Sequence, residues 1–179
     1  MKLNITTATS IFLISISANA QPNRNEASFW YAATTEFGCI MSVAVREPPS
    51  DTDPLPYVEL SYIYANKNPS SLSTIPLNEL RLEVSFIDYG PDDALELQID
   101  IDGDTLALND YHYANGVSLF RASAEQTRDV LSAMKGNRPV TLQLTETSEN
   151  QTFSRTLQEA NFAAEVSRLE LCLEQMQSD

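Results

Sequence analysis

Alternating apolar and polar residues dominate most of the chain and predict a series of β-strands. In residues 80–88 the apolar side chains occupy every second position, as in a strand with one buried and one solvated face. Residues 57–64 and 95–101 show the same alternation. Shorter apolar segments complete the predicted strands, at residues 39–45, 105–108, 117–120, 140–144 and 153–157.

Turn-forming residues separate these segments. Asp102-Gly103 lies between two alternating runs and predicts a hairpin, because both central positions of such a turn need positive φ. Residues 47–56 contain four prolines, and residues 66–76 are rich in Asn, Ser and Pro. Both segments are therefore predicted loops.

The apolar spacing becomes helical toward the C-terminus. Ser123 and Gln126 form a capping-box pattern at the start of a predicted helix that ends at Gly136. Asn161 is a candidate cap for a second helix, whose apolar stripe comprises Phe162, Val166, Leu169, Leu173 and Met176. We therefore predict a mainly β fold, an antiparallel β-sandwich with two short helices in the C-terminal third, as a single domain over residues 29–179.

The N-terminus has the pattern of a secretory signal peptide. Lys2 precedes the short apolar run 11–16, and Ala18-Asn19-Ala20 matches a cleavage site of the A-x-A type. We expect cleavage after Ala20, a flexible arm over residues 21–28, and a periplasmic or secreted protein. No later apolar run approaches the roughly 20 residues that span a bilayer, so we expect no integral membrane segment after cleavage.

The charge balance is strongly acidic. The formal net charge is −14, and loss of Lys2 with the signal peptide would move it to −15. This excess argues against nucleic acid and anionic lipid surfaces as partners. It favours cationic partners or divalent cations over anionic ones, but a solvated acidic surface is the simpler explanation.

The chain has two cysteines, Cys39 and Cys172. In an oxidising compartment an even number of cysteines indicates disulfides, so we predict one bridge between them. Two free buried thiols and an intermolecular bridge are the alternatives.

Several segments of the C-terminal half resemble the invasion-associated locus B family. Residues 119–123 lead into a helix that ends at residues 131–136, and residues 139–144 and 153–157 precede a final helix. Members of that family are exported bacterial proteins with a β-sandwich-like domain.

The resemblance extends to the N-terminal side, where Trp30 and Cys39 match an early Trp and Cys of the family. Family members often carry a Cys pair before the first helix, and residues 114–124 contain none. The resemblance therefore implies no disulfide scheme and no catalytic residues. It implies a role in envelope or host interaction.

Two polar clusters are candidate sites. Asp100, Asp102 and Asp104 present oxygen ligands at alternate positions, as calcium prefers, but Gly103 breaks the EF-hand order and the hairpin also explains them. His112 is the only histidine, which rules out a multi-histidine zinc site. A Ser–His–Asp triad needs one histidine only, yet no Gly-x-Ser-x-Gly motif locates a nucleophile.

Tyrosines gather in two stretches. They offer contact area with a polar tip, so they are a candidate binding face, although half-buried sheet positions are the usual place for tyrosine. The residues are Tyr57, Tyr62, Tyr64, Tyr111 and Tyr113.

The sequence favours a non-enzymatic, exported interaction or envelope-associated protein, with another protein as its partner and no cofactor. Two alternatives stay open. One is a small periplasmic hydrolase that uses carboxylates, which needs two converging acids, at least one with a raised pKa. The other is a divalent-cation-dependent binding module built on the Asp100–Asp104 hairpin. The oligomeric state is not readable from the sequence.

Overall fold

A computed structural model of the chain describes residues 29–45, 58–67, 77–87, 89–90, 92–114, 116–148, 151–157 and 161–178. The predicted signal peptide, the predicted arm over residues 21–28, Tyr57 and most of the two predicted loops lie outside these ranges. These predictions, and the domain limits that depend on them, stay predictions.

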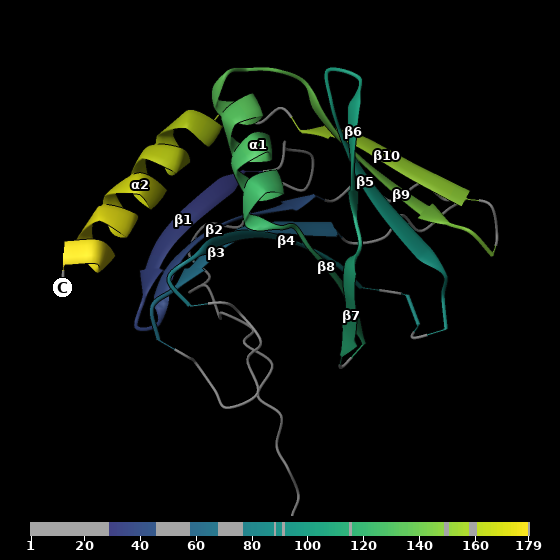
Figure 1. The fold of residues 1–179 in the computed structure, drawn as a ribbon, viewed down its shortest axis with the longest axis horizontal. Coiled ribbons are helices and arrows are strands. Elements are labelled where there is room, and N and C mark those ends of the chain that lie inside the picture. Colours follow the sequence, from purple (N-terminus) through teal and green to yellow (C-terminus); the bar gives the residue numbers. More distant parts are fainter. Residues whose placement is uncertain are drawn as a thin grey trace, which may run out of the picture.

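The fold is mainly β, with two antiparallel sheets and two helices (Figure 1). The larger sheet has the order β1 (Trp30–Thr35), β2 (Gly38–Val45), β3 (Val58–Ala65), β4 (Leu80–Ile87), β8 (Val117–Arg121) and β7 (Asp110–Ala114). The smaller sheet has the order β10 (Gln151–Leu157), β9 (Val140–Glu146), β5 (Leu95–Ile101) and β6 (Asp104–Leu108). The helices are α1 (Ala124–Lys135) and α2 (Phe162–Ser178).

The alternation of the sequence matches the two faces of these strands. In β4, Leu82, Val84 and Phe86 are fully buried, as the pattern predicts. Asp102 and Gly103 have φ angles of 55° and 94°, so the predicted β5–β6 hairpin is confirmed.

Two strands were not predicted. β1 lies on the N-terminal side of the first predicted strand, and β7 covers the stretch around His112. β6 and β7 follow each other with only Asn109 between them, and each joins a different sheet. This passage links the two sheets at their β6 and β7 edges.

The core lies between the sheets and the helices. Trp30 is 2% exposed and its ring centroid lies 5.8 Å from that of Tyr62 and 5.3 Å from that of Phe162. One aromatic residue of β1 thus joins β3 and α2. The smaller sheet contributes its own apolar face, made of Leu97, Ile99, Ile101, Leu108, Val140, Leu142, Leu144 and Leu157.

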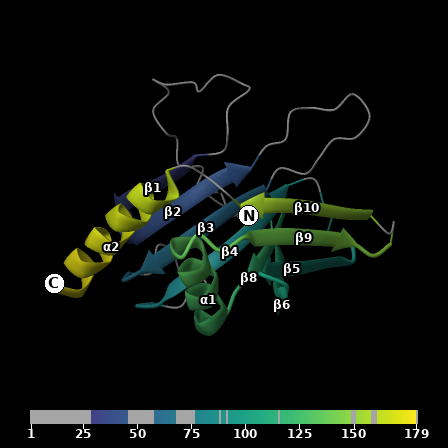
Figure 2. The ribbon, with the colours of Figure 1, turned by 90° about the horizontal axis from the view of Figure 1, so that it is seen from above.

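Both helices lie on the core side of the sheets. α2 runs along β1 and β2, and α1 packs on β4 and β9 (Figure 2). Ser123 and Gln126 form the predicted capping box of α1. The Asn161 side chain has another role, because it accepts from Trp30 N at 3.0 Å and donates to Trp30 O at 2.6 Å.

A disulfide joins Cys39 of β2 to Cys172 of α2, with Sγ atoms 2.03 Å apart, as predicted. The two residues are 133 positions apart, so the bridge closes a loop that contains most of the described chain. Such a bond is compatible with an oxidising compartment.

None of the helices in the described ranges has the length and apolar content of a membrane-spanning helix.

Candidate functional site at the β6–β7 junction

The passage from β6 to β7 creates an opening between the sheets. β6 pairs with β5 from Ile101↔Asp104 to Leu97↔Leu108, and the chain then leaves for the larger sheet. The first residues of β5, Leu95 and Glu96, therefore have β9 as a neighbour but no partner on β6.

A hollow of about 220 Å³ lies at this opening, and we call it the apolar hollow after the leucine and aromatic side chains on two of its walls; polar side chains also line it. Leu95 and Leu97 of β5 line one side, and Tyr111 and Phe120 of the larger sheet line another. The rings of Tyr111 and Phe120 lie 4.9 Å apart between centroids, and Tyr111 is half-buried. The remaining lining residues are Glu96, Gln98, Ala107, Leu108 and Asn109.

A second, polar hollow of about 250 Å³ lies on the other side of Ala107 and Asn109, which border both hollows. Its charged lining comprises Arg81, Asp110 and Arg121. Ser123 and Gln126, at the start of α1, complete its polar wall. We call it the polar hollow below.

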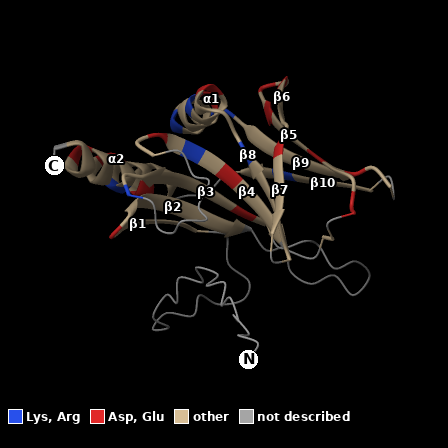
Figure 3. Ribbon diagram, turned by 60° about the horizontal axis from the view of Figure 1, so that its bottom comes forward, with Lys and Arg blue, Asp and Glu red and all other residues tan. Residues whose placement is uncertain are grey.

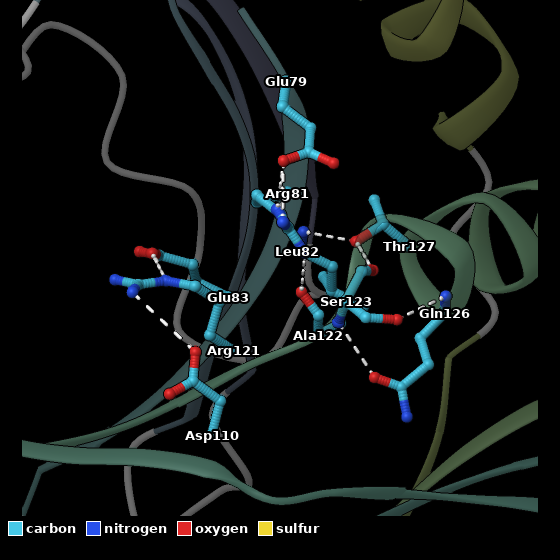
Figure 4. A network of polar contacts seen from close by, with 10 residues as sticks. All are labelled: Glu79, Arg81, Leu82, Glu83, Asp110, Arg121, Ala122, Ser123, Gln126 and Thr127. Atoms are coloured by element: carbon cyan, nitrogen blue, oxygen red, sulfur yellow. Dashed lines mark hydrogen bonds and ion pairs between the residues drawn. The ribbon is translucent and has the colours of Figure 1, made fainter. Parts of the chain in front are cut away.

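The register of the larger sheet builds a charged row across three strands. Glu83 of β4 lies opposite Arg121 of β8, which lies opposite Asp110 of β7. Arg121 Nε is 2.8 Å from Glu83 Oε1, and its Nη1 is 3.9 Å from Asp110 Oδ2 (Figure 4). His112 Nε2 lies 2.9 Å from Asp110 Oδ1 and extends the row along the edge strand β7.

Exposure changes sharply along this row. The side chains of Glu83 and Arg121 are 10% and 9% exposed, whereas those of Asp110 and His112 are 54% and 46% exposed. A buried ion pair of this kind forms only with close geometry, because both charges lose water. The row therefore has a fixed inner end and an accessible acidic end at β7.

Arg81 belongs to a neighbouring group of contacts. Its guanidinium binds Glu79 Oε2 at 2.7 Å and donates to Ala122 O at 3.1 Å. Leu82 N donates to Thr127 Oγ1, whose hydroxyl donates to Ser123 O. These contacts fix the start of α1 against β4 and so set the wall of the polar hollow (Figure 4).

Helix side chains occupy two of the four sheet edges. On β1, Trp30 N donates to Asn161 and Ala32 N donates to Glu165 Oε2 at 2.9 Å. On β6, Gln126 Nε2 donates to Ala107 O at 2.9 Å. Bonds of this kind replace the missing neighbouring strand.

The other two edges, β7 and β10, have a neighbouring strand on one side only within the described residues. β7 is the more exposed of the two where it borders the hollows, and four of its five residues are exposed. Tyr111 N donates to Asn109 O at 3.1 Å instead of to β8. Strand alternation then turns the amide of Tyr113 to the same outer side.

The structure separates the predicted tyrosine face. Tyr62 and Tyr64 are 0% and 6% exposed, because they point into the core, and so they do not contribute to a surface. Tyr111 borders the apolar hollow and Tyr113 is 37% exposed. Only this second stretch lies at a surface among the described tyrosines of the predicted face.

The Asp100, Asp102 and Asp104 cluster serves the hairpin. Asp100 Oδ1 accepts from Gly103 N at 3.1 Å, and Asp102 takes the left-handed turn position. No three His, Cys, Asp or Glu side chains within the described ranges are grouped so that they could hold a metal ion.

One carboxyl in the described part of the chain has a clearly shifted pKa. Burial raises the pKa of Glu59, and a hydrogen bond from Ser61 opposes the rise. Glu59 shares a sheet face with Glu83 and lies diagonal to it, since Glu59 pairs with Ser85 and Ser61 pairs with Glu83. Glu83 is paired with Arg121, Glu59 accepts from Ser61, and neither carboxylate borders either of the two hollows.

The sequence analysis did not single out Glu83, Arg121 or Glu165, and it named Asn161 only as a helix cap. The alternation of Asp110 to Ala114 was a signal for β7, with Tyr111 and Tyr113 on one face. The pairing of Glu83 with Arg121 depends on strand order, which no local pattern contains.

Comparisons with protein-family models, curated proteins and solved structures find no match for this chain.

Proposed function

We propose that this chain is an exported bacterial protein that acts by binding another protein at its envelope, rather than by catalysis, and that it is related to the invasion-associated locus B family. The signal-peptide pattern, the disulfide and the C-terminal resemblance support this proposal. Binding would take place at the β7 edge.

The observation that carries the proposal is the contrast between the sheet edges. Helix side chains bond to the backbone of β1 and β6, while the exposed β7 has no such cover among the described residues. Uncovered edges are costly because they invite pairing with other chains, so natural proteins usually protect them. An uncovered edge beside an apolar hollow is therefore suited to recognition of a partner.

The chemistry of the hollows supports binding over catalysis. The apolar hollow offers Leu95 and Tyr111, which are partly exposed and suit an apolar side chain. In the polar hollow, the arginines are already paired with Glu79 and Glu83. Glu59, whose pKa is raised, lies outside both.

Site-specific cross-linking in cells tests the proposal. The bacterium that encodes the chain exports it with benzoylphenylalanine in place of Tyr113, and a matched strain carries the same group in place of Gln175, which is exposed on α2. We expect a discrete covalent adduct with another protein from Tyr113 and none from Gln175. The exported chain should also lack residues 1–20 by intact mass.

The proposal is wrong if light yields no adduct from Tyr113, or the same products from both positions. An adduct of twice the chain's mass would assign the edge to a second copy.

A further inference from the structure

We infer that the β7 edge binds an extended, lysine- or arginine-bearing segment of a partner protein, which adds as a further strand and places an apolar side chain in the apolar hollow. This inference rests on the proposed function and names the chemistry of the partner at the same edge.

The backbone of β7 supplies the first part of the recognition. The β7 register with β8 runs from Asp110↔Arg121 to Ala114↔Val117, so one side of the strand is fully paired. On the other side, the amide of Tyr113 points outward, whereas that of Tyr111 already donates to Asn109 O. A guest strand would bond to the outward backbone at Tyr113, and such main-chain bonds supply affinity with little sequence preference.

The inner face of β7 supplies an apolar pocket. Tyr111 and Tyr113 lie on the face of the larger sheet that carries Phe120, and Tyr111 borders the apolar hollow. Leu95 and Leu97 form the opposite wall, where β5 has no β6 partner beyond Leu97. Alternate side chains of a guest strand point to this face, so apolar ones fit there.

The outer face of β7 carries the acidic group that would select a basic partner. Asp110 and His112 point to that face, and Asp110 is half exposed. The nearest described cation, Arg121, is 9% exposed and already lies against Glu83, so it offers little repulsion to an incoming cation. Lysine or arginine at the remaining alternate positions of a guest strand would lie beside Asp110.

The charge of the chain as a whole has the same sign as that of Asp110. Glu96 borders the apolar hollow, and Asp102 and Asp104 lie further away, at the tip of the β5–β6 hairpin, which is the end of β6 remote from β7 (Figure 3). The whole chain has a net charge of −14, which attracts a basic segment and repels an acidic one. A second copy of this chain carries that same charge and is disfavoured for the same reason.

The β10 edge lacks these features. Neither hollow borders it, and its exposed side chains are Gln151, Thr152, Ser154 and Thr156, which carry no charge. The strand also carries a cation, Arg155. The observations therefore assign the basic segment to β7.

Synthetic peptides test the inference on the exported full chain. A fluorescent peptide of alternating valine and lysine is compared with one of alternating valine and glutamate, by anisotropy at low ionic strength. We expect the lysine peptide to bind at least about tenfold more tightly, and added salt to weaken it. Only every second residue of the peptide directs its backbone N–H toward β7. N-methylation of these residues should abolish binding, whereas N-methylation of the residues between them should not.

Variants locate the binding on the protein. Asp110→Asn should weaken the lysine peptide about two- to fivefold, as expected for an exposed charge pair. Asp129→Asn, an exposed control on α1, should leave binding unchanged. Both variants should melt at the wild-type temperature.

The inference is overturned if both peptides bind equally, if neither binds, or if neither N-methylated set differs from the parent. If Tyr113 still cross-links to a partner protein in cells, these results do not contradict the proposed function. Loss of the cross-link itself overturns the proposed function and the inference together.

Discussion

At Gly38 the backbone of β2 passes very close to β3. The residue has a φ of 153°, and a Cβ built there would lie 1.9 Å from Tyr64 O. No side chain fits in that space, because the obstacle is backbone that is held by the sheet.

Gly38→Ala should therefore lower the free energy of unfolding by more than about 2 kcal/mol. Chemical denaturation in urea measures the change. Gly90→Ala is the control, since its Cβ would lie 3.5 Å from the nearest atom, a side-chain oxygen of Asp93. Equal stability of the two variants would show that β2 and β3 can move apart at Gly38.

Glu59 gives a prediction about pH. Burial raises the pKa of its carboxyl, so the folded protein binds this proton more tightly than the unfolded chain does. The protonated form is favoured in the folded state, and stability falls as pH rises from the ordinary glutamate range through the raised pKa. Ionised Glu59 is thus unfavourable at neutral pH.

Glu59→Gln keeps the shape and removes this ionisation. Its free energy of unfolding, relative to wild type, should increase between about pH 4 and about pH 7. Urea denaturation at both pH values measures the difference. A relative loss of stability at the higher pH would mean that the Glu59 charge is favourable.

At the scale of elements, α2 has two tasks. Its buried stripe, with Phe162, Val166 and Leu169, packs on the core. Side chains at its start accept hydrogen bonds from the outer backbone N–H groups of β1. Glu165 is 6% exposed and also binds Arg168 at 3.0 Å, so the carboxylate at the edge is held from two sides.

Asn161→Ala should lower the free energy of unfolding by about 1–3 kcal/mol, because Trp30 N and O would lose their partner in a buried position. Gln175→Ala, exposed on the same helix, should stay within about 0.5 kcal/mol of wild type. Thermal or urea unfolding of both variants measures this. If they behave alike, packing alone holds α2 on β1.

The local elements were largely predictable, and their assembly was not. Alternation predicted β4 and β5, and Asp102-Gly103 predicted the β5–β6 hairpin. Ser123 with Gln126 predicted the start of α1. Each of these signals lies within a few residues of the chain. β7 was missed because it follows β6 after a single residue, Asn109, with no turn signal between them. The site was therefore predicted only in part, through Tyr111 and Tyr113.

Long-range partners lie beyond local patterns. The sequence gives no indication that Arg121 meets Glu83 or that Asn161 meets Trp30, since these contacts depend on strand order and helix docking. Cys39 and Cys172 are the exception, because two cysteines in an exported chain leave a single intramolecular pairing.

For the whole molecule, the disulfide is the covalent long-range constraint. It ties β2 to the C-terminal helix across 133 positions, and Thr34 Oγ1 lies 3.2 Å from Cys172 Sγ. A loop of this length restricts the unfolded chain strongly.

The double variant Cys39→Ala, Cys172→Ala should lose about 4–5 kcal/mol of unfolding free energy by the loop-entropy argument. Urea unfolding of the exported protein measures the loss, with reduced wild type as the control. A loss below about 1 kcal/mol would show that the bridge adds little to the packing of α2.

The larger sheet has a covered edge at β1 and, within the described residues, an uncovered edge at β7. Amide hydrogen exchange, followed residue by residue by NMR in the exported protein, measures that difference most directly. The account predicts slow exchange at Ala32, whose amide bonds to Glu165, and fast exchange at the outward amide of Tyr113, which slows when a basic partner strand binds. Slow exchange at Tyr113 in the free protein, equal to that at Ala32, would contradict it.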